Sequence, residues 1–395
     1  MSTRTHRTGM LGVVAAALGL TTGGSGALAK PPEGVNVPSY AQFSKDNAIP
    51  MIIRSAIPGV NGRIDKIAFD PERYYVFITG VRAGSVYIQN LATHKTVQRL
   101  DKLPEPRAVA YFPDQRRLAV ACGGDGSVRV FLANDKGEFE PERSVDFLGE
   151  ADGLTVEPPI FDDASLPPAV WVSHAMSVHR MDVLSGEKSR EIRLPGRADG
   201  VAFGTIDGKR RLFINVPRPD SPDGRPEEKP APVVVVADPD TGTIESVWPL
   251  KDASPTSAIA VDEANARLFV TTKDPGKLIV LDAKTGQEVN RLDAPADAGV
   301  ICYDAALQRI FVPGGAAGGK IAVYQRTGVG APLDKVEKKV DSPFGAIDRY
   351  EQVYVSATTA GCRTAVLDPN ERLLIAAAPS LGADPVFIFV YMIGP

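Results

Sequence analysis

The sequence predicts an all-β protein built from repeated copies of one short structural unit, and three observations support this prediction. Short apolar segments recur about 42 residues apart, a spacing typical of repeat proteins whose unit is a small sheet. Apolar and polar residues alternate within these segments with a period of two, which indicates strands and excludes helices. The 37 Gly and 33 Pro residues mark frequent turns between short elements.

The first two strands of each unit are visible as two series of segments. Small residues alternate with bulky apolar ones in the first series, which covers residues 66–69, 108–111, 153–156, 200–203, 258–261, 300–303 and 364–367. A more apolar series follows at residues 75–78, 118–120, 170–172, 212–214, 268–270, 310–312 and 373–375. Asp, Pro or Gly residues separate most of these pairs, as expected for a turn between antiparallel strands.

A third and a fourth strand complete the unit. The third ends in an Asp-x-x-Thr/Ser-Gly turn at residues 182–186, 238–242 and 282–286, and an alternating strand leaves that turn, as at 288–292. A four-stranded meander of this kind cannot bury both of its faces alone, whereas seven of them in a ring can. The sequence therefore predicts a seven-bladed β-propeller whose repeats begin near residues 65, 107, 152, 199, 257, 299 and 363.

Both ends of the propeller are expected to meet in one blade. The last unit supplies only three strands, and the apolar segment 50–56 precedes the first unit. We expect this N-terminal segment to form the outer strand of the last blade, because that pairing removes an open sheet edge. A single propeller domain then spans residues 30–395.

Residues 1–29 have the features of a secretory signal peptide. Arg4 and Arg7 precede an apolar stretch at 10–20, and the small residues Ala27-Leu28-Ala29 follow. We expect cleavage after Ala29 and a periplasmic or secreted protein. The apolar stretch is shorter than the roughly 20 residues that cross a bilayer, so no membrane span is expected.

Charge and cysteine content narrow the partners. A net charge of −4 offers no support for nucleic-acid binding, and we expect a monomer that binds none. The 3 Cys residues cannot form a disulfide framework, and we expect all of them to be free.

The units resemble those of the YVTN-repeat, YncE-like seven-bladed propellers of exported bacterial proteins. The family's repeat pattern is matched by residues 200–202 (GVA), 267–270 (RLFV) and 282–286 (DAKTG), and residues 361–369 (GCRTAVLDP) resemble a segment near its end. The resemblance implies a propeller and export. It assigns no activity, since such propellers include binding proteins, lactonases, lyases and redox partners.

A site is expected on one face of the ring. The loops that lead into the innermost strands share this top face with the loops between second and third strands, and propeller ligands usually bind there. The candidate residues near the starts of inner strands are Asp65, Arg107, Asp152, Asp199, Asp297 and Arg363. Two insertions, 217–232 and 341–362, are placed on the same face. The second, interpreted as a long segment leading into blade seven, adds Tyr350 as a ligand contact.

The carboxylates at this mouth have three interpretations, all of them open at this point. They are ion-paired scaffold groups, or they recognise an organic ligand together with Arg107 and Arg363, or Asp65, Asp152 and Asp199 hold Ca²⁺ or Mg²⁺. No sequence motif requires a cofactor.

We therefore expect an exported propeller that binds a small molecule or a periplasmic protein at its top face. The alternative is a lactonase- or lyase-type enzyme. In that alternative His174 acts as general acid or base beside Asp152 and Asp199, with a divalent metal at the acidic mouth.

Overall fold

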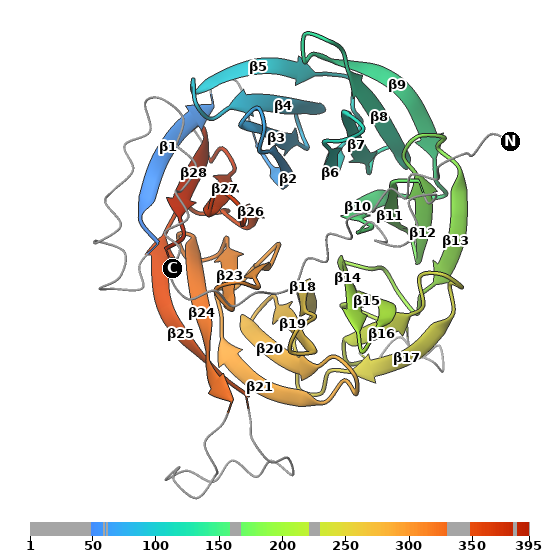
Figure 1. Cartoon of the computed structure of the whole chain (residues 1–395), viewed down its shortest axis with the longest axis vertical. Coiled ribbons are helices and arrows are strands. Elements are labelled where there is room, and N and C mark those ends of the chain that lie inside the picture. Colours follow the sequence, from blue (N-terminus) through green and yellow to red (C-terminus); the bar gives the residue numbers. More distant parts are fainter. Residues whose placement is uncertain are drawn as a thin grey trace, which may run out of the picture. The chain divides into compact units, whose positions relative to one another are not determined.

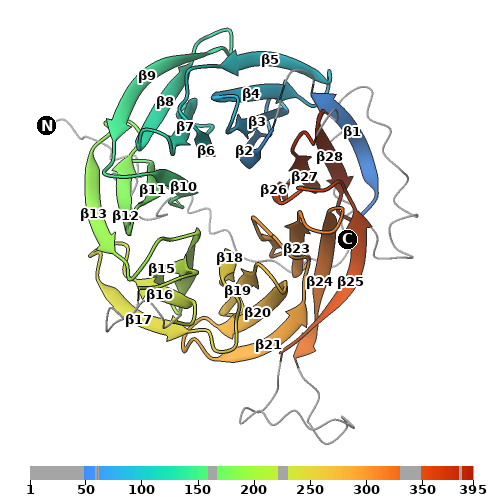
Figure 2. The ribbon, with the colours of Figure 1, turned by 180° about the vertical axis from the view of Figure 1, so that it is seen from behind.

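The computed structural model describes residues 49–57, 60, 62–158, 167–220, 230–329, 348–381 and 385–394. These residues form strands and turns. The strands make seven four-stranded antiparallel sheets that stand as blades around a common centre (Figures 1 and 2). The prediction of an all-β, seven-bladed β-propeller is confirmed. In the described part of the chain, no helix has the length and apolar character needed to cross a membrane.

Each blade is a meander from the centre outward. The innermost strands are β2 (Ile64–Asp70), β6 (Pro106–Phe112), β10 (Ala151–Val156), β14 (Gly200–Ile206), β18 (Thr256–Asp262), β22 (Cys302–Asp304) and β26 (Thr364–Asp368). The second strands are β3 (Tyr75–Gly80), β7 (Arg117–Cys122), β11 (Ala169–His174), β15 (Lys209–Val216), β19 (Arg267–Thr272), β23 (Arg309–Gly314) and β27 (Leu373–Ala378). The third strands are β4 (Ser85–Asn90), β8 (Ser127–Ala133), β12 (Ser177–Asp182), β16 (Val233–Ala237), β20 (Lys277–Asp282), β24 (Lys320–Val329) and β28 (Val386–Met392). The outer strands are β5 (Lys95–Leu100), β9 (Phe139–Asp146), β13 (Lys188–Arg193), β17 (Ile244–Pro249), β21 (Glu288–Asp293), β25 (Asp348–Ala357) and, for blade seven, β1 (Met51–Ile57).

The N-terminal strand closes the ring, as the sequence predicts. Strand β1 pairs antiparallel with β28, so that Ile53 lies opposite Val390 and Ile57 opposite Val386. Ile57 is fully buried in a cluster that also contains Val60 and Ile64, at the junction of blades seven and one. The first strand of the described chain therefore completes the last blade and also packs against the first.

The core is divided among the contacts between blades. Each pair of neighbouring blades shares one cluster of buried apolar side chains. Between blades one and two, for example, the rings of Phe77 and Tyr111 lie 5.0 Å apart and Phe139 meets Phe77 edge-on at 5.4 Å. Apolar residues on both faces of the inner strands make these clusters possible, because each blade is covered on two sides.

Blade six differs from the expectation. Residues 348–357 do not lead into blade seven; they form β25, the outer strand of blade six, which pairs along β24. Tyr350 lies near the start of β25, at the end of the blade opposite the top face. It is buried, and its ring meets Phe269 of blade five edge-on at 5.6 Å. The placement of Tyr350 at the mouth is therefore wrong, because the fourth strand of blade six stands far along the chain from the third. Residues 341–347 lie outside the described part.

Candidate functional site

Strand pairing defines the top face. Ala151, at the start of β10, pairs with His174 at the end of β11, and Gly200 of β14 pairs with Asn215 near the end of β15. The loops that lead into inner strands and the loops that leave second strands therefore lie at the same end of each blade. Side chains of neighbouring blades meet at this end, as Arg107 of blade two and Asp152 of blade three do.

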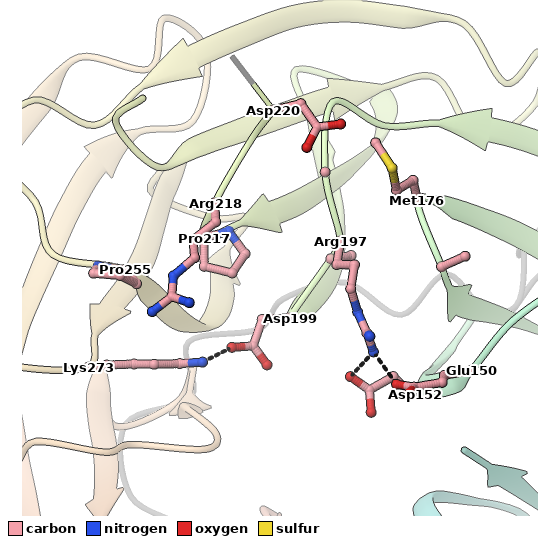
Figure 3. Close-up of a pocket in the computed structure, with 13 residues that line it drawn as sticks. Glu150, Asp152, Met176, Arg197, Asp199, Pro217, Arg218, Asp220, Pro255 and Lys273 are labelled. Atoms are coloured by element: carbon pink, nitrogen blue, oxygen red, sulfur yellow. Dashed lines mark hydrogen bonds and ion pairs between the residues drawn. The ribbon is translucent and has the colours of Figure 1, made fainter. Parts of the chain in front are cut away.

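A pocket of about 770 Å³ lies on the top face where loops of blades three, four and five meet (Figure 3). Its lining mixes charged side chains with small apolar ones. The residues are Glu150, Asp152, Ala175, Met176, Gly196, Arg197, Ala198, Asp199, Pro217, Arg218, Asp220, Pro255 and Lys273. A pocket of this size, with a few polar groups directed inward, is typical of small-molecule sites.

One wall of the pocket depends on a glycine. The backbone N–H of Asp220 donates to the carbonyl oxygen of Pro195 at 2.6 Å, which holds the segment after β15 against the loop leading into β14. A Cβ atom on Gly196 would lie 2.5 Å from the Arg218 carbonyl oxygen and 3.0 Å from the Cα of Pro219. Only glycine allows this close approach, which places Arg218 and Asp220 beside the pocket.

Two arginines enclose the acids of blade three. Arg107 of blade two lies 2.8 Å from Asp152 and 3.1 Å from Glu150. Arg197, in the loop leading into β14, lies 2.7 Å from Glu150 and 3.6 Å from Asp152. These pairs link three consecutive blades, and each of the two carboxylates lies against both arginines; Arg107 also pairs with Glu105 at 2.8 Å.

The pKa values at this network reflect the pairing. Burial by itself lowers the pKa of the Arg107 guanidinium, but hydrogen bonds to Asp152 and Glu105 outweigh it and the pKa lies above its ordinary value. The hydrogen bond and charge of Arg197, with the charge of Arg107, lower the pKa of Glu150. Glu150 is therefore a carboxylate at neutral pH and no proton donor.

The opposite wall carries a second ion pair. Lys273, after β19, extends toward Asp199 with its Nζ atom 2.6 Å from a carboxylate oxygen (Figure 3). The backbone of Asp199 is fixed by its N–H, which donates to the Asn215 carbonyl oxygen at 3.0 Å. Arg218 points into the pocket beside this pair and makes no ion pair with any described residue.

The structure brings only some of the predicted site residues together. Asp152 and Asp199 line the same pocket, and Arg107 contacts Asp152 from outside it. The remaining three candidates form separate pairs: Asp65 with Arg63 in blade one, and Asp297 with Arg363 at 3.0 Å between blades six and seven. The predicted ring is thus a set of local ion pairs, one group of which borders the pocket.

The metal interpretation finds no matching geometry. Among the described residues no group of three or more His, Cys, Asp or Glu side chains is arranged to hold a metal ion. Asp65, Asp152 and Asp199 each lie against a different cation: Arg63, Arg107 and Lys273. A divalent cation would compete with all three of these neighbours.

His174 does not face the mouth. It is buried, its Nδ1 lies 2.9 Å from the Leu148 carbonyl oxygen, and its Nε2 lies 2.6 Å from Nδ1 of His179. Its ring also packs on Phe147 at 5.1 Å. With both ring nitrogens engaged, His174 has no free atom for a ligand, and the structure places it as a packing residue between blades two and three.

Four lining residues that carry charge were not expected from the sequence: Glu150, Arg197, Arg218 and Asp220. A local signal exists for two of them. The loops leading into four inner strands carry a charged residue two positions before the expected one, as Arg63-x-Asp65, Glu105-x-Arg107, Glu150-x-Asp152 and Arg197-x-Asp199. For Arg218 and Asp220, only their location in the 217–232 insertion indicated the top face.

Comparisons with known proteins support the fold and assign no function. No protein-family model and no curated protein matches this chain. A chain of hydrazine synthase from Kuenenia stuttgartiensis is similar at 18% identity and a TM-score of 0.64, over 84% of this chain and 98% of that one. A chain of a mitotic checkpoint complex is similar at 14% identity and a TM-score of 0.62, over 92% and 98%. At such identities the likeness shows that this chain has the β-propeller fold shared by proteins of unrelated function.

Proposed function

We propose that this protein is an exported, YncE-like propeller that binds a small molecule in the top-face pocket of blades three to five. The pocket itself carries the proposal: loops of three blades converge on a volume of about 770 Å³, with cationic and acidic side chains on its walls. Its ion pairs hold the charged walls in place before a ligand arrives, which lowers the entropic cost of binding.

We do not extend the proposal to a lactonase or lyase. His174, the expected general acid or base, is occupied by Leu148 and His179. Asp152 and Asp199 are each paired with a cation. A protein partner at the top face remains the competing form of binding, and the experiment below separates it from a small molecule.

Export and family membership are further parts of the proposal. Residues 1–29 carry the basic, apolar and small-residue segments of a signal peptide, and residues 361–369 resemble the YncE-like pattern. Expression in a bacterial host followed by fractionation tests export. We expect a periplasmic or secreted protein whose first residue is Lys30. An uncleaved chain retained in the cytoplasm would contradict it.

The ligand proposal is tested by a thermal-shift screen of the purified protein against small carboxylic acids, amines, amino acids, lactones and divalent metal salts. A ligand at a hundredfold excess over its Kd stabilises the native state by about 2.7 kcal/mol, which is readily seen as a higher Tm.

The variant Met176→Trp reduces the volume of the pocket, and Met51→Trp, on the outer strand β1, is its control. We expect shifts that Met176→Trp abolishes and Met51→Trp retains. If no compound raises the Tm, or if Met176→Trp changes none of the shifts, the pocket is not a small-molecule site and a protein partner becomes the better proposal.

A further inference from the structure

A second pocket, of about 640 Å³, adjoins the top-face pocket on the side of blades four and five. Pro217, Arg218 and Pro255 line both pockets, so the two share a border. The other lining residues are all apolar: Pro219, Pro230, Ala231, Pro232 and Ala253. Proline rings therefore form most of this surface, and Arg218 is the one charged residue among the described residues that line it. We call it the proline-lined pocket.

The backbone holds the walls of the proline-lined pocket in place. The carbonyl oxygen of Pro232, just before β16, accepts from the Leu250 N–H at 2.8 Å. The carbonyl oxygen of Pro255, just before β18, accepts from the Lys273 N–H at 2.8 Å. A proline ring fixes φ and has almost no rotamer freedom to lose, so a ligand that packs on these walls orders little of the protein.

The border between the two pockets has a surplus of positive charge. Figure 3 shows the Arg218 guanidinium directed toward Lys273 and Asp199. Lys273 and Asp199 pair with each other at 2.6 Å, whereas Arg218 makes no ion pair with any described residue. Two cations and one carboxylate therefore meet at this border, and one further negative charge would balance them.

The other side of the top-face pocket has the opposite balance, because carboxylates outnumber cations there. The groups are Glu105, Glu150, Asp152 and Asp220, against Arg107 and Arg197. An anionic group is therefore disfavoured across the top-face pocket and favoured at the border beside Arg218.

We propose that the proline-lined pocket is a second binding site, for a small aromatic carboxylate. The carboxylate accepts a two-point hydrogen bond from the Arg218 guanidinium at the border. The aromatic ring packs on the proline rings, in the same pairing by which aromatic grooves recognise proline-rich peptides, with the roles of protein and ligand exchanged. This site goes beyond the proposed function, because Met176 and the charged residues of blade three do not line it.

Isothermal titration of the purified protein tests the two features of the ligand separately. 3-Phenylpropanoate carries both. 3-Phenylpropanamide lacks the charge, 3-phenylpropylamine reverses it, and propanoate lacks the ring. We expect 3-phenylpropanoate to bind about tenfold or more tightly than each of these, since each loses the charged hydrogen bond or the buried ring. 3-Cyclohexylpropanoate, which keeps the charge and an apolar ring, should bind about threefold less tightly because it lacks the aromatic face.

Two variants assign the two ends of the ligand. Arg218→Gln should weaken the binding of 3-phenylpropanoate about tenfold and leave that of 3-phenylpropanamide unchanged. Ala231→Phe fills the proline-lined pocket and should abolish the binding of both compounds. The matched controls are Arg99→Gln, at a half-exposed side chain of blade one, and Ala264→Phe, in the exposed turn between β18 and β19. A retained unfolding transition checks the fold of each variant.

The outcomes separate this inference from the proposed function. Met176→Trp should leave the binding of 3-phenylpropanoate unchanged. If the uncharged or ring-less compound binds as tightly as 3-phenylpropanoate, or if Arg218→Gln and Ala231→Phe behave like their controls, the second site is overturned. Equal or tighter binding of 3-cyclohexylpropanoate overturns the preference for an aromatic ring. If other compounds bind in a manner that Met176→Trp abolishes, the top-face pocket stands as a ligand site whatever the result for the proline-lined pocket.

Discussion

The Nε2 atom of His174 lies 2.6 Å from the Nδ1 atom of His179, and this contact defines the role of both rings. A carbonyl oxygen only accepts, so Nδ1 of His174 must donate to Leu148. When the His174 ring is uncharged, its Nε2 atom accepts from the Nδ1–H of His179. The pair is a hydrogen-bonded link from strand β12, through β11, to the loop between blades two and three.

The histidine pair predicts a loss of stability in mild acid. Burial, and then the charge of His174, lower the pKa of His179; nearby Glu191 opposes this and Lys188 adds to it. Because the pKa of His179 is lower in the folded state, the unfolded chain binds the proton more tightly. The stability that uncharged His179 contributes is fully present above its pKa in the unfolded chain, about 6.5. It declines as the pH falls from there toward the lower pKa that His179 has in the folded protein.

We therefore expect the difference in Tm between the native protein and His179→Asn to shrink as the pH is lowered from 7.5 to 5.5. The asparagine amide still donates toward His174 but does not titrate. The control is His94→Asn at an exposed histidine, whose positive φ of 57° asparagine tolerates. Parallel stability curves for the native protein and His179→Asn would contradict the prediction.

A buried carboxylate between blades three and four is predicted to be essential for stability. Glu157 accepts from the Trp171 indole at 3.2 Å and from Arg180 at 2.7 Å, and it also pairs with Arg210 of blade four. Removal of this charge leaves the largely buried Arg180 with no carboxylate partner among the described residues, and Arg210 with only the exposed Asp240. We expect Glu157→Gln to lower the free energy of unfolding by about 3 kcal/mol, measured by urea denaturation.

The matched control is Asp240→Asn. Asp240 also pairs with Arg210, but its side chain is 60% exposed. We expect that variant to lose about 0–1 kcal/mol, as is usual for a surface ion pair. Equal losses in the two variants would show that burial of Glu157 does not determine the effect.

Because β1 closes the ring, we expect its buried side chains to contribute as much to the free energy of unfolding as those of a core strand. Ile57 is fully buried against blades seven and one. We expect Ile57→Ala to destabilise the protein by about 2–5 kcal/mol in urea denaturation. Val97→Ala, on the exposed outer strand β5, should cost less than about 0.5 kcal/mol. A small effect of Ile57→Ala would mean that the propeller is stable without this closure.

The three cysteines are predicted to be inert in the folded protein. Cys122, Cys302 and Cys362 are free and buried, and burial raises the pKa of each thiol to about 12. Since the thiolate is the reactive form, a thiol reagent such as Ellman's reagent at pH 8 should detect no thiol in the native protein and all three in denaturant. Rapid reaction of any thiol in the native protein would contradict this placement.

Gly196 is predicted to control the pocket without carrying a charge. In Gly196→Ala the new Cβ would press on the Arg218 carbonyl at 2.5 Å and push residues 218–220 away from the loop leading into β14. We expect ligand affinity to fall about tenfold or more, because the wall that carries Arg218 and Asp220 is displaced from the pocket. Titration calorimetry measures the affinity, and a retained unfolding transition checks the fold. Unchanged affinity would show that the pocket tolerates displacement of this wall.

The sequence by itself determined the architecture, because the features that specify it are local. Strand periodicity, turn residues and the repeat spacing are properties of neighbours along the chain, and they predict seven blades and the closing strand 50–56. Even so, the outer strand of blade six was missed. Residues 348–357 contain the Val and Tyr residues that favour strands, but their distance from β24 along the chain concealed the pairing.

Only the tertiary structure decided which charged residues form a site. Arg107 meets Asp152, and Lys273 meets Asp199, across blade boundaries that no local pattern describes. These contacts depend on side-chain distances of a few ångströms between residues dozens of positions apart. Packing between blades likewise buries His174 against His179, and it places Arg218 and Asp220 on the wall of the pocket.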